Sequence, residues 1–338
     1  MPIQEFLLLN SPVIDVRSPG EFDHGHIPGA HNLPLFSNEE RAVVGTLYKN
    51  KGRDAAMLEG LRIIGPHMAE LVERSRAIAS DGNIRVHCWR GGERSASVAW
   101  LLEKAGFEKV VTLVHGYKAF RKQVLDSFIQ PLELRILGGY TGTGKTQLLH
   151  LMKERGEQVI DLEGLAKHKG SSYGGIGEAA QPTTEHFENL LWDELRKIDH
   201  SRPLWLEDES INIGRVKMPD VLFANLRSAP VLFVDMPAKF RVQLLVEVYG
   251  SYPKKELAEA TMRIERRLGP QHAKDALAAL EQGDLHTVAA IALSYYDKTY
   301  ARGLSNRDPA KTTLLRVDTK DLNEIAVRLL EHEHARNN

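Results

Sequence analysis

The sequence predicts an α/β protein made of two parallel-sheet domains. Short apolar strands alternate with helical patterns along most of its 338 residues, which is typical of parallel sheets covered by helices. This length corresponds to about two domains of ordinary size. A helical pattern over 117–130 is followed directly by Pro131, so we place the boundary near 125–132. The expected domains are residues 1–130 and 131–338.

Each expected element follows from its hydrophobic pattern. In the first domain the expected strands are 13–16, 83–87 and 110–113, and the expected helices are 57–77, 95–104 and 117–130. In the second domain the expected strands are 132–137, 158–161, 203–207, 230–235 and 313–317. The expected helices there are 146–155, 184–198, 239–249, 254–268, 273–282, 285–299 and 322–334. Gly106 lies just beyond 95–104, where a glycine commonly ends a helix.

Composition and charge favour an ordinary globular protein of the cytoplasm. The chain is 42% hydrophobic and 26% charged, and it has no apolar run near the ~18–20 residues that cross a bilayer. Its first ten residues lack the basic segment of a signal peptide. The net charge of −1 does not indicate a nucleic-acid binder, although a few clustered Lys and Arg suffice for phosphate contacts. We expect a monomer, because the sequence has no long heptad pattern.

The single cysteine, Cys88, lies in a segment suited to nucleophilic chemistry. One cysteine cannot form an internal disulfide or a cysteine-based zinc site. Residues 87–97 read His-Cys-Trp-Arg-Gly-Gly-Glu-Arg-Ser-Ala-Ser, so Cys88 follows a strand and precedes a glycine-rich loop and a helix. Backbone N–H groups and the positive helix end should then surround the sulfur and favour its thiolate. The predicted anion cradle of this loop consists of Trp89, Arg90, Gly91, Gly92 and Arg94.

The Cys-x5-Arg spacing also occurs in cysteine phosphatases, and the residues upstream separate the two families. Residues 13–34 contain Asp-x-Arg at a strand end, then Glu-Phe, Gly-His-Ile-x-Gly-Ala and Asn-x-Pro. Residues 5–128 thereby resemble the rhodanese family, which implies a rhodanese-like fold and a chalcogen carried on Cys88. Asp15 and Arg17 are interpreted as structural. With no second cysteine, the chalcogen must pass to another molecule. Glu93 adds a negative charge to the loop, and we expect it to point toward Arg90 or solvent.

Residues 139–146 read Gly-Tyr-Thr-Gly-Thr-Gly-Lys-Thr, which is the Walker A pattern of a phosphate loop. A strand is expected before it and a helix after it, as such a loop requires, so the second domain should be P-loop NTPase-like, similar to nucleoside kinases. Lys145 would reach the terminal phosphate, and the Thr146 hydroxyl could ligate Mg²⁺. The predicted phosphate-binding residues are Gly139, Thr141, Gly142, Thr143, Gly144, Lys145 and Thr146.

A bound Mg²⁺ would need a second acid, and the strand over 203–207 supplies candidates. It runs into Glu207, Asp208 and Glu209, so Asp208 or Glu207 could hold the metal through water. The alternative is a solvated acidic turn. Asp161 ends another strand at the edge of the sheet where such domains bind ligands.

The glycine-rich segment 170–177 predicts either a mobile lid or a plain surface loop. Three arginines fall on the helix expected over 254–268, where they either bind phosphates or form a solvated face with Glu259 and Glu265. The candidate lid, RNA or phosphate contacts are Ser171, Ser172, Tyr173, Arg263, Arg266 and Arg267. Three further aromatic residues at near-helical spacing favour a core role over base stacking; they are Tyr295, Tyr296 and Tyr300.

A rhodanese-like domain followed directly by a phosphate loop indicates a more specific family than the rhodaneses as a whole. With Cys-Trp-Arg-Gly-Gly at 88–92 and Gly-Gly-Tyr-Thr-Gly-Thr-Gly-Lys-Thr at 138–146, nearly the whole chain resembles the tRNA 2-selenouridine synthase family. The resemblance implies a transferase that binds the anticodon arm and acts on the wobble 2-thiouridine of tRNAs for Lys, Glu and Gln. It implies S-geranylation from geranyl diphosphate at the phosphate loop. It then implies replacement of the sulfur by selenium from selenophosphate, carried on Cys88, with a selenophosphate-producing enzyme as a candidate partner.

Two other functions stay open from the residues alone. An ATP-dependent tRNA sulfurtransferase would activate its substrate at the phosphate loop and sulfurate it from a Cys88 persulfide. A non-catalytic module would sense nucleotide and dock a sulfur carrier, and it would tolerate replacement of Cys88 by serine.

Overall fold

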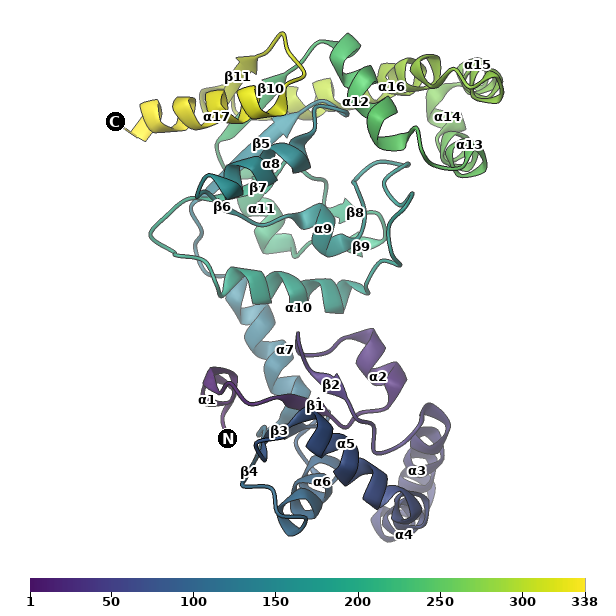
Figure 1. Ribbon diagram of the computed structural model, residues 1–338, viewed down its shortest axis with the longest axis vertical. Coiled ribbons are helices and arrows are strands. Elements are labelled where there is room, and N and C mark those ends of the chain that lie inside the picture. The colour runs from purple at the N-terminus through teal and green to yellow at the C-terminus, as the bar shows by residue number, and fades with distance from the viewer. Residues whose placement is uncertain (338) are drawn as a thin grey trace. The chain divides into compact units, whose positions relative to one another are not determined.

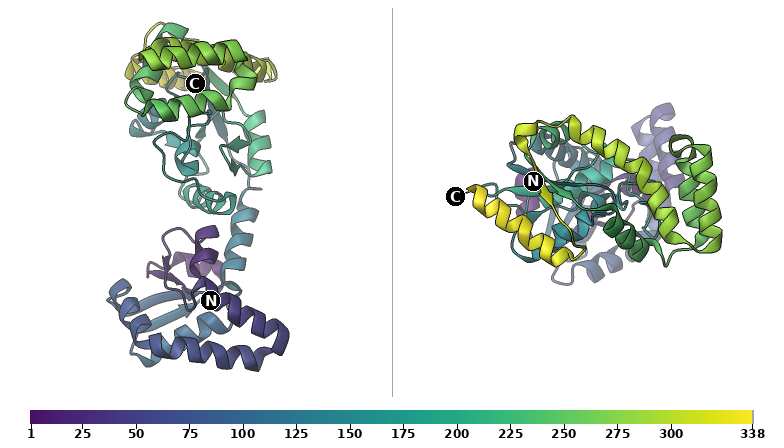
Figure 2. Two further views of the ribbon diagram at one scale, coloured as in Figure 1. Left: turned by 90° about the vertical axis from the view of Figure 1, so that its right-hand side faces the viewer. Right: turned by 90° about the horizontal axis from the view of Figure 1, so that it is seen from above.

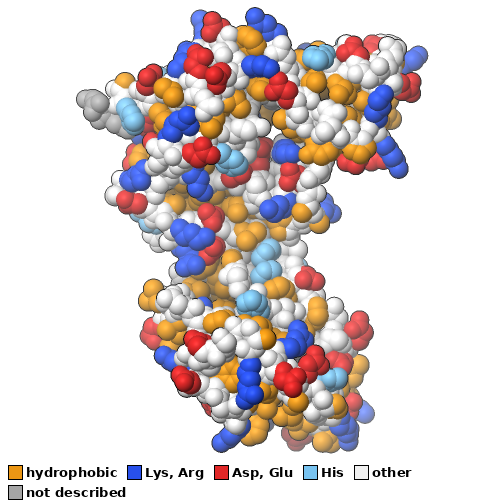
Figure 3. All heavy atoms as spheres, in the orientation of Figure 1, with side chains coloured by type: hydrophobic (Ala, Val, Ile, Leu, Met, Phe, Trp, Pro, Cys, Tyr) orange, Lys and Arg blue, Asp and Glu red, His pale blue; other side chains and the backbone are white. Residues whose placement is uncertain are grey.

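The computed structural model describes residues 1–337, which form two compact α/β units (Figure 1). The first unit comprises Met1–Ser127 together with Glu188–Trp192, and the second comprises the rest of the described chain. No helix among these residues is long and apolar enough to span a bilayer. Acidic and basic side chains are interspersed over the face seen in Figure 3, as the net charge of −1 would suggest.

A four-stranded parallel sheet of order β2-β1-β3-β4 forms the centre of the first unit. Its core joins strand residues such as Ile14 and Val86 to Leu102 of α6, all fully buried. The elements are α1 (Ile3–Leu8), β1 (Val13–Asp15), α2 (Pro19–His24), β2 (His31–Asn32), α3 (Asn38–Lys51), α4 (Arg53–Ile64), η1 (Gly65–His67), α5 (Met68–Ile78), β3 (Asn83–His87), α6 (Glu93–Lys104), β4 (Lys109–Thr112) and α7 (Gly116–Ser127).

Two features of this unit differ from the sequence-based expectation. The single helix expected over 57–77 is two helices, α4 and α5, with a 3-10 turn between them. Pro66 explains the break, since it has no N–H for a helical hydrogen bond and its ring obstructs the carbonyl four residues earlier. Helix α3 was not expected, although Ser37 and Glu40 form a capping box at its start. That Ser-x-x-Glu signature was readable in the sequence.

The second unit contains a five-stranded parallel sheet of order β11-β10-β5-β7-β6 and a small antiparallel hairpin, β8-β9. Helices α8 and α17 pack against each other over this sheet (Figure 1). The elements are β5 (Leu134–Gly139), α8 (Lys145–Glu154), β6 (Gln158–Val159), α9 (Leu162–Ala166), α10 (Thr184–Leu195), β7 (Leu204–Glu207), β8 (Asn212–Ile213), β9 (Val216–Lys217), α11 (Asp220–Ser228), β10 (Val231–Asp235), α12 (Ala238–Tyr249), α13 (Lys254–Arg263), α14 (Glu265–Leu268), α15 (Pro270–Gln282), α16 (Leu285–Ser305), η2 (Pro309–Lys311), β11 (Thr312–Arg316) and α17 (Leu322–Asn337).

Helices α13 to α16 gather into a lobe at one side of the second unit, opposite α17 in the view from above (Figure 2). The lobe has its own core, which includes Leu257, Ile264 and Leu280. The helix expected over 254–268 is divided at Ile264, whose φ of −104° and ψ of 3° end α13. Both sheets are parallel and flanked by helices, which confirms the predicted α/β class.

Candidate active sites

Cys88 directly follows strand β3 and begins a tight loop. The loop carbonyls are held by the start of α7, because Tyr117 N donates to Cys88 O at 2.9 Å and Lys118 N donates to Trp89 O at 3.0 Å. Gly91 and Gly116 have positive φ of 64° and 55°, and a Cβ on Gly116 would lie 2.3 Å from Cys88 O. Glycine is therefore required at both positions, where two backbone segments meet.

The Cys88 sulfur lies at the N-terminal end of α6. The thiol is buried, and its Sγ is 3.2 Å from the Ser95 hydroxyl. The first N–H groups of α6 have no acceptor within the helix, so they and the helix dipole favour an anion beside the sulfur. A pocket of about 860 Å³ opens there, with Arg90 and Arg94 in its lining. Sequence reasoning did not single out Ser95, whose place in the first turn after the loop was the available signal.

The charged residues of the loop have more specific partners than expected. Arg94 donates to Glu21 at 2.6 Å, so its charge is already shared with a carboxylate. Glu93 faces solvent, one of the two expected alternatives, with its side chain 59% exposed, and it pairs there with Arg53 at 2.5 Å. Arg90 itself is exposed at the pocket, which makes it the cation best placed to meet an incoming anion.

Asp15 and Arg17 form a buried pair beneath this loop. Both side chains are 0% exposed, and their closest charged atoms are 2.6 Å apart. Arg17 also donates to Gly25 O at 2.7 Å, and its guanidinium lies 3.8 Å from the Tyr117 ring centroid. These contacts join β1, α2 and α7, which supports the structural interpretation of the pair.

Replacing Arg17 with methionine is expected to lower the free energy of unfolding by about 3–5 kcal/mol, because Asp15 would remain buried without its cation. Urea denaturation would measure the change. Arg62→Met is the matched control, since it breaks an exposed pair with Glu59 and should cost about 0–1 kcal/mol. Equal effects of the two substitutions would contradict the structural role.

The phosphate loop joins β5 to α8 at the middle of the second sheet. Strand β5 lies between β10 and β7. Because strands that come later in the chain lie on both sides of β5, the loop after it lies at a switch point in the strand order, where open α/β sheets bind ligands. Gly142 and Gly144 have φ of 83° and 73°. A Cβ on Gly142 would approach a Leu245 side-chain carbon at 2.9 Å. Arg241 stabilises the loop, because its guanidinium donates a hydrogen bond to Thr141 O at 3.2 Å.

Buried carboxylates surround the end of this loop. Thr146 donates its hydroxyl hydrogen bond to Glu163 at 2.6 Å, and Glu163 is hydrogen-bonded to Glu209. Glu207 is fully buried and accepts a hydrogen bond from Leu162 N. The sequence indicated Glu207, but it did not indicate that Glu163 would contact Thr146 or that Glu209 would lie beside Glu163. They meet because β7 pairs with both β5 and β6, so the segments after these strands share one edge.

The buried carboxylates near the phosphate loop and Lys145 shift one another's pKa values. Burial alone would lower the pKa of Lys145, but Tyr300 and the Glu209 and Glu163 carboxylates overcome this and raise it. Burial, followed by the charge of Glu163, raises the pKa of Glu209 to about 8. Lys145 is therefore cationic at neutral pH, and the Glu209 carboxyl keeps its proton to a higher pH than an ordinary glutamate.

Glu209→Gln is expected to weaken the pH dependence of stability. The folded-state pKa of Glu209 is about 8 against an ordinary value of 4.5. Between these values the folded state binds the extra proton, so the free energy of unfolding falls as pH rises from about 5 to 8. Glutamine does not titrate, and the fall should become smaller. Thermal unfolding at several pH values would test this, with the exposed Glu154→Gln as control; an unchanged slope in Glu209→Gln would contradict it.

The other predicted acids have different partners. Asp208, expected as a second acid for Mg²⁺, pairs instead with Arg227 at 3.2 Å and with Arg307. Asp161 caps α9 and lies 2.8 Å from His150. The carboxylate that contacts Thr146 is therefore Glu163, whereas we had considered Asp208, Glu207 or Asp161 as the second acid. Within residues 1–337, no group of three or more His, Cys, Asp or Glu side chains forms a ready metal site.

The glycine-rich segment 170–177 is anchored to the helical lobe. Tyr173 is buried and its hydroxyl lies 2.8 Å from Thr261 Oγ1. Ser172 N donates to the Tyr296 hydroxyl at 3.0 Å, and Arg263 donates to Ser172 O at 2.8 Å. Arg263 thus supports this segment, where we had considered it a phosphate ligand. These contacts make the segment a packed loop, whereas we had considered a mobile lid or a plain surface loop.

The remaining candidates divide between the lobe and the phosphate loop. Arg266 and Arg267 lie on α14, separate from Arg263 on α13. Tyr295 and Tyr296 pack against the core of the lobe, as expected. Tyr300 differs, because its ring centroid lies 5.2 Å from Lys145 Nζ and covers the phosphate-loop lysine.

Two cavities meet at the phosphate loop. One, of about 290 Å³, is lined by Lys145, Thr146 and Glu163 among others. The second, of about 60 Å³, is lined mainly by apolar side chains of α12, α13 and α16. Both contain the same four boundary residues, which are Thr141, Ser171, Leu245 and Tyr249. A polar phosphate cavity thus continues into an apolar one.

Comparison with known proteins places both units in one family. Residues 5–123 match the rhodanese-like domain, and residues 132–333 match the tRNA 2-selenouridine synthase AAA domain. The tRNA 2-selenouridine synthase of Bdellovibrio bacteriovorus is 36% identical, over 88% of this chain and 90% of that protein. Those of Sulfurovum sp. and Hydrogenovibrio crunogenus are 35% and 34% identical, with the same two coverages. The chain therefore belongs to the tRNA 2-selenouridine synthase family.

Proposed function

We propose that this enzyme converts wobble 2-thiouridine to 2-selenouridine, in tRNAs for Lys, Glu and Gln, by two successive reactions. The first transfers a geranyl group from geranyl diphosphate to the sulfur of the base. The second replaces the alkylated sulfur with selenium that comes from selenophosphate by way of Cys88. The first reaction is assigned to the domain over 131–338 and the second to the domain over 1–130.

The observation that carries the first assignment is the junction of two cavities at Thr141, Ser171, Leu245 and Tyr249. A prenyl diphosphate is itself a polar head joined to an apolar chain. Its diphosphate suits the cavity at Lys145, and its chain suits the neighbouring apolar cavity between α12 and α16. At about 60 Å³ that cavity would have to widen to take a whole geranyl chain.

Chemistry at the phosphate loop follows from its charges. When the base sulfur attacks the first carbon of the geranyl group, the bond to diphosphate breaks and negative charge grows on the leaving oxygen. Lys145 and the loop N–H groups are placed to stabilise that charge. Where Mg²⁺ accompanies the diphosphate, Thr146 and Glu163 are the residues that would hold it, with phosphate oxygens and water completing its shell.

S-alkylation makes the second reaction feasible. A thiocarbonyl sulfur is a poor leaving group, whereas an alkylated sulfur departs as a thiol. The Cys88 thiolate can attack the phosphorus of selenophosphate, so that an S–P bond forms, the P–Se bond breaks and selenide is released beside the alkylated base. Selenide then displaces geranyl thiol from the base, and water hydrolyses the S–P bond to restore the Cys88 thiol and release phosphate. Arg90 and the first turn of α6 would hold the anion during this attack.

Since tRNA is cytoplasmic, we place the enzyme in that compartment. It would act as a monomer on the anticodon arm of its tRNA. A selenophosphate-producing enzyme would supply its selenium donor.

The decisive experiment offers purified enzyme an anticodon stem-loop that contains 2-thiouridine. Geranyl diphosphate is added first and selenophosphate second, and the nucleosides are identified by mass spectrometry. Successive appearance of the geranylated and then the selenated base is expected. If no geranylated base forms but ATP with a sulfur donor supports sulfuration from Cys88, the enzyme is an ATP-dependent sulfurtransferase instead.

A further inference from the structure

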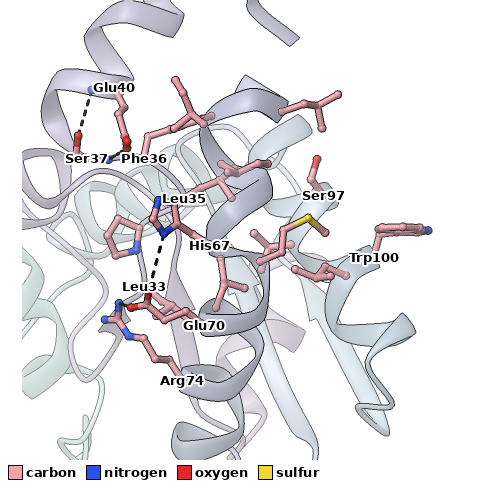
Figure 4. A pocket seen from close by; sticks show the side chains of 18 of the residues that line it. Leu33, Leu35, Phe36, Ser37, Glu40, His67, Glu70, Arg74, Ser97 and Trp100 are labelled. Atoms are coloured by element: carbon pink, nitrogen blue, oxygen red, sulfur yellow. Dashed lines mark hydrogen bonds and ion pairs between the residues drawn. The ribbon is translucent and has the colours of Figure 1, made fainter. Parts of the chain in front are cut away.

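An apolar groove lies beside the Cys88 pocket in the first unit. Helices α3 to α6 and the segment after β2 form its walls. It consists of two adjoining cavities of about 530 Å³ and 610 Å³. Figure 4 shows the larger of these, with Ser97 and Trp100 on one helix and Glu70 and Arg74 on another. The residues that line both cavities are Leu35, Phe36, Leu61, Ile64 and Ser97.

The groove is continuous with the pocket that contains Cys88. Arg41, Glu93 and Arg94 line both that pocket and the 530 Å³ cavity. All three are in ion pairs, since Arg41 and Arg94 contact Glu21 while Glu93 contacts Arg53. The groove is therefore charged where it meets Cys88 and mainly apolar where its two cavities join, and its far rim carries Glu70 and Arg74.

This change in polarity indicates the kind of occupant. A partner helix could cover the apolar part of the groove without the groove being connected to the Cys88 pocket. An apolar chain attached to the group that reacts at Cys88 could reach the groove only through such a connection. Each cavity also has the size of a small-molecule site, roughly 300–1,000 Å³. Leu61 and Trp100 remain 54% and 56% exposed, so a bound apolar chain would cover side chains that now face water.

We propose that this groove holds the prenyl chain of the S-alkylated base while selenium is transferred. The inference rests on the proposed function, because only S-alkylation supplies such a chain. Each buried methylene contributes about a factor of four to affinity, so the groove would select the geranylated base over unmodified 2-thiouridine. The order of the two reactions would then be enforced by binding at the second site as well as by leaving-group chemistry.

The test uses two synthetic anticodon stem-loops that carry S-geranyl-2-thiouridine or S-methyl-2-thiouridine at the wobble position. Both have an alkylated sulfur as leaving group, and neither requires the enzyme's own alkylation step. The measured quantity is kcat/KM for selenation of each RNA in the presence of selenophosphate. For the unaltered enzyme, we expect the S-geranyl RNA to be preferred by at least about tenfold.

Leu61→Gln makes the groove polar and is the main variant. Leu58→Gln is its matched control, because Leu58 lies on the same helix, is 53% exposed, and is not among the residues that line the three cavities. Glutamine is uncharged, so contacts to RNA phosphates are unaffected. We expect Leu61→Gln to lower the geranyl-to-methyl preference at least about fivefold and Leu58→Gln to leave it unchanged. Trp100→Gln is a second groove variant.

An unchanged preference in both Leu61→Gln and Trp100→Gln would overturn the groove as the chain site. An equal loss of rate on both RNAs would also overturn it, because the chain would not be what the groove recognises. If the unaltered enzyme fails to selenate the S-geranyl RNA at all, the proposed function itself fails. That result is obtained before any variant is compared, so the two failures are distinguishable.

Discussion

Lys145→Ala is expected to lower the rate of geranylation by about a hundredfold to a thousandfold, because it removes the cation that stabilises the departing diphosphate. Lys145 lines the cavity of about 290 Å³ at the phosphate loop. Burial alone would lower its pKa, but Tyr300 and the nearby carboxylates raise it. Mass spectrometry of 2-thiouridine RNA incubated with geranyl diphosphate would measure the rate.

The same variant provides its own control for folding. Given RNA that already carries S-geranyl-2-thiouridine, Lys145→Ala should perform the selenium step at the normal rate. Lys153→Ala, on the exposed side of α8, should affect neither step. Loss of both activities in Lys145→Ala would indicate misfolding or a single shared site, and normal geranylation would exclude Lys145 from the reaction.

Cys88→Ser is expected to reduce selenation by at least about a thousandfold while geranylation continues. A serine hydroxyl is a poor nucleophile at neutral pH, so it would not release selenium from selenophosphate as a thiolate does. The S-geranyl base should therefore accumulate when both donors are supplied. Ser95→Ala tests the neighbouring hydroxyl, 3.2 Å from the sulfur, and should retain part of the activity. Full selenation by Cys88→Ser would show that selenium transfer does not depend on this residue.

The two sites differ in how much of their geometry the sequence predicted. The Cys88 loop and the phosphate loop are both continuous segments, and their backbone geometry depends on glycines at fixed positions within or beside them. The carboxylates beside Thr146 are different. Glu163 and Glu209 lie 17 and 63 residues along the chain from Thr146, and only the sheet order brings them together.

The same distinction explains the acids and arginines that we assigned differently. Asp208 follows β7 as predicted, but its partners Arg227 and Arg307 come from later segments. Arg263 supports the 170–177 segment through Ser172, a contact between residues 91 positions apart. Spacing along one helix could not reveal either partner.

By itself, the sequence determined the α/β class and the family and predicted Cys88 as the nucleophile and the phosphate loop, because each is encoded in local patterns of strand, glycine and charge. The tertiary structure decided which carboxylates face Thr146, which cations are already paired, and where apolar cavities adjoin the two sites. These depend on strand order and helix packing, which join residues that no local pattern relates.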